Sequence, residues 1–126
     1  KEKYQVFTNK GTCYLNLGLY KEASESFGAV YRLGVRERYL LSQYAFSLRK
    51  KGDIKQALLV YKELIGLFPD ETSAYKNAGI IYDLYMNLPR EAIGYYKEYI
   101  ERGGPDSVNV KNWRQVAMDK TKGWFE

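Results

Sequence analysis

Histidine is absent from the sequence and cysteine occurs only once, so the side chains that many enzymes and metalloproteins depend on are missing. Without histidine, the usual zinc and haem sites and the Ser-His and Cys-His catalytic arrangements lack their parts. The single Cys13 excludes an internal disulfide, and we expect it to be a small buried hydrophobic residue. Paired carboxylates could still support acid–base chemistry through Asp83, but acids such as Glu22 and Glu63 fall on outward helical positions. We therefore expect no enzymatic activity and no bound metal or cofactor.

Long apolar runs are also missing. Lys, Arg, Asp or Glu interrupts every hydrophobic stretch before it reaches the roughly 20 residues that span a bilayer. We therefore expect a soluble protein that does not insert into a membrane. The chain starts at Lys1 without an apolar segment and cleavage site, so a signal peptide is either absent or already removed. The compartment stays open between the cytoplasm and a periplasmic or envelope-associated location.

The chain is well supplied with core-forming residues. Of its 126 residues, 45% are hydrophobic and 16% are aromatic, which is enough for the packed core of one domain. The net charge of +5 favours acidic partners weakly. Because the 20 basic and 15 acidic residues are interspersed, this charge is typical of a solvated helical surface.

A pattern with a period near 34 residues runs through the chain. Ala23 and Ala57 are 34 residues apart, Ala57 and Ala92 are 35 apart, and an aromatic residue follows each alanine four positions later. Residues at i and i+4 share one helical face, where the small side chain lets a second helix approach and the ring fills the space beside it. Small residues also stand in a preceding helix, twelve or thirteen positions earlier, at Gly11, Ala45 and Gly79.

Turn-forming residues separate these helices, notably Gly18, Gly52, Pro89 and the Gly-Gly-Pro sequence at 103–105. Nothing in the pattern indicates a sheet. The spacing predicts seven helices, at about residues 4–17, 21–33, 38–50, 54–67, 72–86, 89–102 and 108–121.

This two-helix unit resembles the tetratricopeptide repeat, whose consensus alternates aromatic and small residues and ends on a proline. The three units match it at Phe7, Gly11, Tyr14, Gly18, Tyr20, Ala23 and Phe27; at Ala45, Leu48, Gly52, Ile54, Ala57, Tyr61 and Pro69; and at Tyr75, Gly79, Tyr82, Ala92, Tyr96, Tyr99 and Pro105. Three tandem matches at nearly constant spacing are hard to obtain from an unrelated helical bundle. The departures are Val35 in place of proline, Leu41 in place of an aromatic residue, and one extra residue around Met86 to Pro89.

The resemblance implies an all-α fold, a right-handed α-solenoid of three helix-turn-helix hairpins in a single domain. The repeats would cover about residues 4–35, 38–70 and 72–105, and the last one needs a capping helix, at about 108–121. In this cap we expect Trp113 to pack on the third hairpin rather than to bind a ligand. Trp124 and Phe125 would form either a frayed end or a segment docked back on the protein.

The family packs its first helices along the concave wall of a superhelix, so the resemblance implies that their free faces line a binding groove. This surface would be rich in amides and hydroxyls, with Tyr39 and Phe46 as aromatic anchors, and would suit an extended peptide. Its residues are Gln5, Thr8, Asn9, Thr12, Asn16, Tyr39, Ser42, Gln43, Phe46, Arg49, Ser73, Lys76, Asn77, Ile80 and Asp83.

Amide side chains recur at equivalent places of the three units, at Asn9, Gln43 and Asn77. An amide can both donate to and accept from a peptide bond, so this row could hold a peptide main chain irrespective of its sequence. The alternative is a fixed hydrogen bond within each repeat. The aromatic stripe of Tyr39 and Phe46 also has an alternative, which is packing against the preceding hairpin.

The best-known binding site of the family, a two-carboxylate clamp for chaperone C-terminal peptides, requires lysine and arginine residues in the first and third units. The residues at the corresponding places of this sequence are all uncharged: Thr8, Thr12, Gln43, Ser73 and Asn77. We therefore expect no chaperone-tail binding of that type.

The predicted function is a scaffold that binds a partner protein or peptide, as a subunit or domain of a larger assembly and, by loose resemblance, a bacterial one. One alternative is nucleic-acid binding by basic residues interleaved with tyrosines. The other is self-association into homo-oligomers through uncovered terminal surface. The cluster that supports the nucleic-acid alternative is Arg36, Arg38, Tyr39, Tyr44, Arg49, Lys50 and Lys51.

Overall fold

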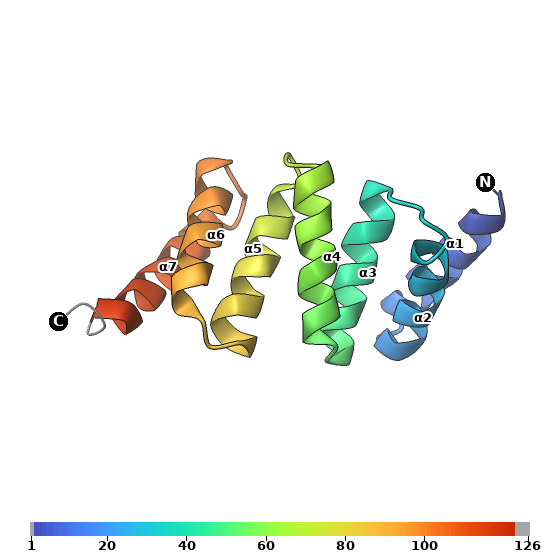
Figure 1. The fold of residues 1–126 in the computed structure, drawn as a ribbon, viewed down its shortest axis with the longest axis horizontal. Coiled ribbons are helices and arrows are strands. Elements are labelled where there is room, and N and C mark those ends of the chain that lie inside the picture. The colour runs from blue at the N-terminus through green and yellow to red at the C-terminus, as the bar shows by residue number, and fades with distance from the viewer. Residues whose placement is uncertain (1, 123–126) are drawn as a thin grey trace. The chain divides into compact units, whose positions relative to one another are not determined.

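A computed structural model describes residues 2–122, which form α-helices and one π-helical turn and contain no strand (Figure 1). The predicted Trp124 and Phe125 lie outside the described residues. The elements in chain order are α1 (Glu2–Asn16), α2 (Tyr20–Tyr31), α3 (Arg38–Lys51), α4 (Ile54–Leu67), α5 (Thr72–Ile80), η1 (Ile81–Tyr85), α6 (Pro89–Glu101) and α7 (Ser107–Thr121).

The predicted all-α arrangement of helical hairpins is confirmed. The helix ends lie within two residues of the predicted ones, except that the helix expected over 72–86 is α-helical only to Ile80 and continues as η1. Residues with a left-handed backbone mark the predicted turns: φ is +74° at Gly18, +103° at Gly52 and +54° at Asn87. Glycine adopts this conformation without strain, which explains why the helices end there.

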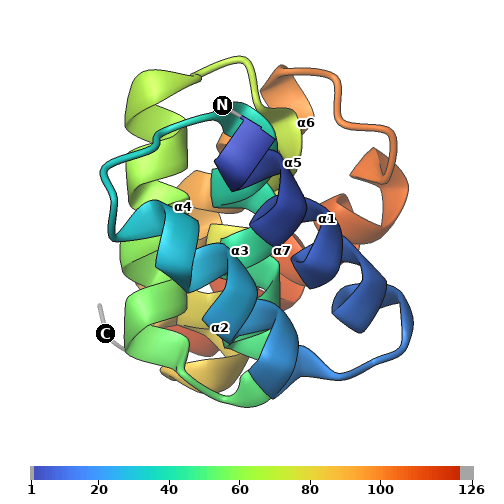
Figure 2. The same cartoon turned by 90° about the vertical axis from the view of Figure 1, so that its right-hand side faces the viewer.

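The chain divides into two compact units, Lys1–Leu64 and Ile65–Glu126. In the first unit, α1 packs on α2 and α2 packs on α3, and Figure 2 shows α1 and α2 in front. In the second unit, α6 packs against α5 and η1 on one side and against α7 on the other. The first unit therefore contains the α1–α2 hairpin, α3 and most of α4, and the second contains the hairpin of α5, η1 and α6 covered by α7.

In two of the hairpins, an aromatic ring of the second helix packs directly against a glycine of the first helix. A Cβ atom on Gly11 would lie 2.7 Å from Cε1 of Phe27, and one on Gly79 would lie 2.6 Å from Cε1 of Tyr96. Carbon atoms normally pack about 3.5–4.0 Å apart, so only glycine admits the buried rings at these two places. The packing of small against aromatic residues that the spacing predicts is thus present in the first and third hairpins.

Cys13 is exposed, so the expectation of a buried cysteine is wrong. It lies on the first helix, 34 residues before Ser47, which is fully buried in α3. The difference lies in the neighbours: α3 packs on α2, whereas among the described residues the face of α1 that carries Cys13 stays exposed.

The extra residue of the third hairpin is accommodated by η1 together with the turn that follows. The Met86 amide donates to the Ile81 carbonyl at 3.0 Å and the Leu88 amide donates to the Tyr82 carbonyl at 2.7 Å. These bonds span five and six residues instead of four, which widens the helix, as in the π-bulges that accommodate insertions. Asp83 lies inside this widened turn and is only 7% exposed, which corrects the expectation of a solvent-facing charge in the groove.

Candidate functional site

Predicted groove residues of α1 and α3 meet around one cavity in the first unit. Its volume is about 370 Å³. The cavity is lined by the predicted Gln5, Thr8, Asn9, Thr12 and Tyr39, together with Tyr4, Val30, Val35, Glu37 and Leu40.

Hydrogen bonds order the wall of this cavity. The Thr12 and Tyr39 hydroxyl oxygens are 2.7 Å apart and join α1 to α3. One turn earlier on α1, the Gln5 amide donates to the Asn9 side-chain oxygen at 2.9 Å. The Thr8 hydroxyl donates to the Tyr4 carbonyl of its own helix. The wall therefore presents amide groups from a fixed surface.

Both predicted aromatic anchors touch the first hairpin. The Phe46 ring meets the Tyr20 ring edge-on, with centroids 6.5 Å apart, and the Arg49 guanidinium lies 5.4 Å from the Phe46 centroid. The Tyr39 hydroxyl is hydrogen-bonded to the Thr12 hydroxyl, and Tyr39 nevertheless remains 46% exposed. Packing against the preceding hairpin is thus present, and it leaves much of the Tyr39 ring open to a partner.

The recurring amides differ in how they are bonded. Asn9 takes part in the bond from Gln5, which is a fixed bond within the repeat. Gln43 and Asn77 are half-buried, and neither side chain forms a hydrogen bond with any residue in the described range. At these two positions the amide groups remain available to a ligand.

The second unit contributes the predicted groove residues of α5. The Ser73 hydroxyl donates to the Glu71 carboxylate at 2.9 Å, and the Lys76 ammonium is 3.6 Å from the Asp106 carboxylate. These two side chains are already engaged. Asn77 and Ile80, further along the same helix, complete the α5 face.

A second cavity, of about 280 Å³, lies between η1 and α7 in this unit. Trp113 packs on Tyr96 as expected, with ring centroids 6.1 Å apart, and also lines this cavity. The sequence analysis places Ile80 and Asp83 in the binding surface but not the other lining residues. The repeat register does not indicate them, because a shift of 35 residues from the predicted α5 positions leads to residues such as Asn112 and Gln115, which do not line the cavity. The lining residues are Ile80, Asp83, Leu84, Tyr96, Trp113, Val116 and Lys120.

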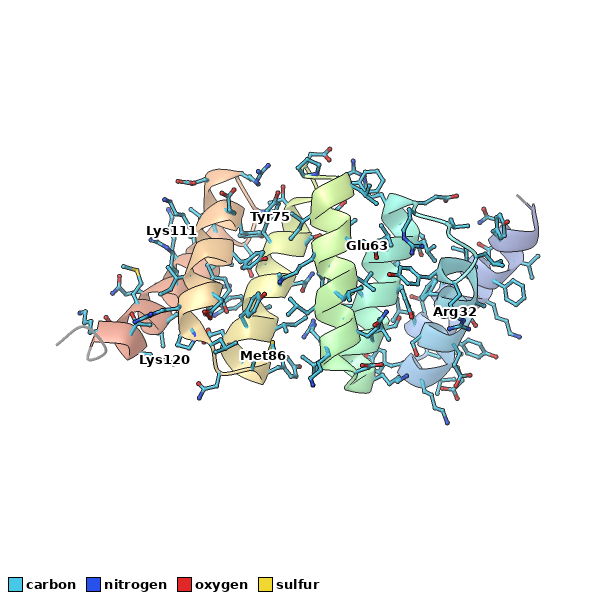
Figure 3. All side chains as sticks on the ribbon, viewed as in Figure 1. Arg32, Glu63, Tyr75, Met86, Lys111 and Lys120 are labelled. Atoms are coloured by element: carbon cyan, nitrogen blue, oxygen red, sulfur yellow. The ribbon has the colours of Figure 1, made fainter. Side chains whose placement is uncertain are left out.

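A polar cluster, buried at Asp83 and Tyr96 and partly exposed at Lys120, forms the floor of the second cavity. The Tyr96 hydroxyl donates to Oδ2 of Asp83 at 3.0 Å, and the ammonium of Lys120, labelled in Figure 3, donates to Oδ1 at 3.3 Å. Burial raises the pKa of Tyr96 above its ordinary value, and the neighbouring Asp83 charge and hydrogen bond raise it further. Tyr96 is therefore a neutral donor, and the charges of Asp83 and Lys120 offset each other.

The basic and aromatic cluster that favoured nucleic acid is largely engaged within the first unit. The Arg36 guanidinium donates to the Glu63 carboxylate at 2.7 Å and stacks 3.8 Å from the Tyr31 centroid. Tyr44 is buried, with its ring 4.9 Å from that of Tyr31. Arg36 and Tyr44 are thus engaged within the fold, whereas Tyr39 of the same cluster remains exposed. Among residues 2–122, no helix is both long and apolar enough to cross a bilayer.

Comparisons with known proteins point in one direction. Among curated proteins, the BBSome complex member BBS4 of Bos taurus is 22% identical over 131 residues; the match covers all of this chain and 24% of that protein. This chain thus spans about a quarter of the relative's length. Two models of the tetratricopeptide repeat match the sequence, at residues 4–33 and 39–71.

Solved structures with the same fold agree. The crystal structure of MamA superposes with a TM-score of 0.86 at 19% identity, covering 94% of this chain and 68% of that one. The first repeat domain of Spaghetti (RPAP3), bound to the HSP90 peptide SRMEEVD, gives a TM-score of 0.82 at 19% identity and covers 94% and 93% of the two chains. With its helical hairpins, its glycine–ring pairs and these matches, the chain belongs to the tetratricopeptide repeat family.

Proposed function

We propose that this protein binds an extended segment of a partner protein through the free faces of α1, α3 and α5, without catalysing a reaction. The observation that carries the proposal is the first cavity, since five of the predicted groove residues line one hollow of about 370 Å³. The unbonded amides of Gln43 and Asn77 add to it, because they can satisfy the main-chain groups that an extended peptide leaves open.

The comparisons support the same class of partner. The RPAP3 domain is described with a bound HSP90 peptide, and BBS4 is a member of a complex. By this likeness, we propose that the three repeats act as one domain with a concave groove, inside a larger assembly. The two-carboxylate clamp remains outside the proposal, since Thr8, Ser73 and Asn77 cannot supply its cations.

The proposal is tested by selection from a phage-displayed library of linear peptides. We expect enriched peptides, and we expect Phe46→Ala and Asn77→Ala to weaken their binding while circular dichroism shows an unchanged fold. Lys97→Ala, an exposed change on α6, is the matched control and should bind normally. No enrichment, or equal binding by both groove variants and the control, would contradict the proposal. Affinity purification from the native host would then identify the physiological partner.

Two further measurements address the alternatives. Micromolar or tighter binding to random oligonucleotides, falling steeply with salt, would favour nucleic acid, whereas a negligible signal at about 100 mM salt would exclude it. Light scattering at several protein concentrations would reveal self-association as a mass that rises with concentration. We expect neither signal to accompany peptide binding.

A further inference from the structure

The second cavity has an apolar rim that the fold leaves uncovered. Leu84 in η1 is 70% exposed and Val116 in α7 is 54% exposed, and both residues line the cavity. In the first unit, the residue in the register position of Val116 is Cys13 on α1 and Ser47 on α3. In the third hairpin the residue at this position is Ile81, 35 residues before Val116, and it is fully buried. Among these four residues, a large apolar side chain is exposed only on α7.

The register of the repeats continues into α7. Val110 and Ala117 are fully buried, and they stand 35 residues after Tyr75 and Tyr82, which are buried in the third hairpin. Asn112 stands 35 residues after Asn77 and therefore occupies the same register position in α7 as Asn77 does in α5. The row of amides thus has a fourth member, on the helix that was expected only to cap the fold.

Asn77 and Asn112 each lie one helical turn before a residue that lines the cavity, which is Ile80 for Asn77 and Val116 for Asn112. Figure 1 shows α5 and α7 running in the same general direction, and on each helix the amide precedes the cavity-lining residues in the chain. Neither amide side chain is hydrogen-bonded within residues 2–122.

We propose that the cavity between η1 and α7 is an anchor site for one large, uncharged apolar side chain of an extended peptide, whose main chain is bound by Asn77 and Asn112. The inference rests on the proposed function, because it specifies the class of peptide and the place where it is held.

Three properties of the site select this occupant. The charges on Asp83 and Lys120 offset each other, so the cavity complements an uncharged side chain. Its volume of about 280 Å³ exceeds the roughly 150 Å³ that accommodates a benzene ring, which leaves room for leucine, methionine or phenylalanine. A helix uses its own main-chain groups internally, whereas an extended chain presents them to amides such as Asn77 and Asn112.

The test uses capped pentapeptides of the form Gly-Ser-Xaa-Ser-Gly, with Leu, Phe, Ala or Glu at the central position. They are titrated into the ¹⁵N-labelled full chain and followed by amide chemical shifts. We expect the Leu and Phe peptides to shift the signals of Leu84 and Val116, with affinities at least tenfold above those of the Ala and Glu peptides. Equal affinities for the Leu and Ala peptides, or no shifts at these residues, would overturn the proposal.

Variants locate the site. Val116→Glu should reduce Leu-peptide affinity at least tenfold, whereas Val108→Glu, on the same helix at a residue that is 76% exposed and outside the cavity, should leave it unchanged. The double variant with Asn77→Ala and Asn112→Ala should reduce the affinities of the Leu and Phe peptides by similar factors. If library peptides bind and Val116→Glu has no effect, the anchor site is wrong while the proposed function stands. If no library peptide binds at all, the proposed function itself fails.

Discussion

A Cβ atom on Gly79 would lie 2.6 Å from Cε1 of Tyr96, so the absence of a side chain at one residue is what admits the ring of the other. The ring has little freedom to retreat, because Tyr96 is 1% exposed and its hydroxyl is bonded to Asp83. This contact joins α5 to α6 and supports the floor of the second cavity.

Gly79→Ala should therefore destabilise the protein even though alanine is the better helix former. We expect a loss of about 1–3 kcal/mol from overpacking, partly offset by about 1 kcal/mol of helix propensity. Gly94→Ala is the matched control in α6, where nothing lies within 4 Å of the added Cβ. It should stabilise by about 0.5–1 kcal/mol. Urea unfolding followed by circular dichroism measures both changes; equal effects of the two variants would contradict the packing argument.

Ala57→Leu should destabilise the first unit in a similar way. Ala57 is fully buried in α4, one of three alanines that define the repeat period. The additional side-chain volume has no space to occupy, and we expect a loss of about 1–3 kcal/mol. Leu59→Ala, at a residue that is 53% exposed on the same helix, should change stability by less than about 0.5 kcal/mol. Thermal unfolding distinguishes the two.

Asp83→Ala should cost more stability than Lys120→Ala. Removing the carboxylate leaves the buried Tyr96 hydroxyl without its acceptor, at a cost of about 1–3 kcal/mol. The Lys120 side chain is 44% exposed, so removal of its ammonium should cost no more than about 1 kcal/mol and less at high salt. Denaturant titrations at two salt concentrations measure this order, and the reverse order would show that the ion pair matters more than the hydroxyl bond.

Stability should fall as the pH rises above 10. Burial raises the pKa of Tyr61 to about 12, and burial together with Glu63 raises that of Tyr31 to about 12, from an ordinary value of 10.0. A raised folded-state pKa means that the stabilisation is complete below pH 10 and is lost as the pH rises to 12. For Tyr61 the loss is on the order of 2–3 kcal/mol. Tyrosinate absorbance should therefore rise together with loss of helical dichroism. Tyr61→Phe should move this loss of stability to higher pH, and an unchanged profile would contradict the assignment.

Cys13 should react with a thiol reagent in the folded protein, since it is exposed. We expect one equivalent of 5,5′-dithiobis(2-nitrobenzoate) to react at nearly the same rate with and without denaturant. A large acceleration on unfolding would show that the thiol is covered in solution.

Much of the fold could be predicted from local patterns. A helix repeats every 3.6 residues, so small and aromatic residues at fixed spacing report which side of each helix is packed. The buried Ala23, Ala57 and Ala92 and the contacts of Gly11 and Gly79 follow that pattern. Half of the residues around the first cavity could also be anticipated, because they lie on the faces of α1 and α3 that remain after the packed sides are assigned; Tyr4, Val30, Val35, Glu37 and Leu40 were not predicted.

The sequence by itself thus determined the period, the helices, their packed faces and the repeat family, since each depends on residues close together in the chain. Only the tertiary structure decided that Cys13 is exposed, that Asp83 is buried within a π-helical turn, and that Trp113 both packs and lines a cavity. These outcomes depend on which helix covers each face and on how an extra residue is accommodated. Both are settled by long-range packing rather than by local spacing.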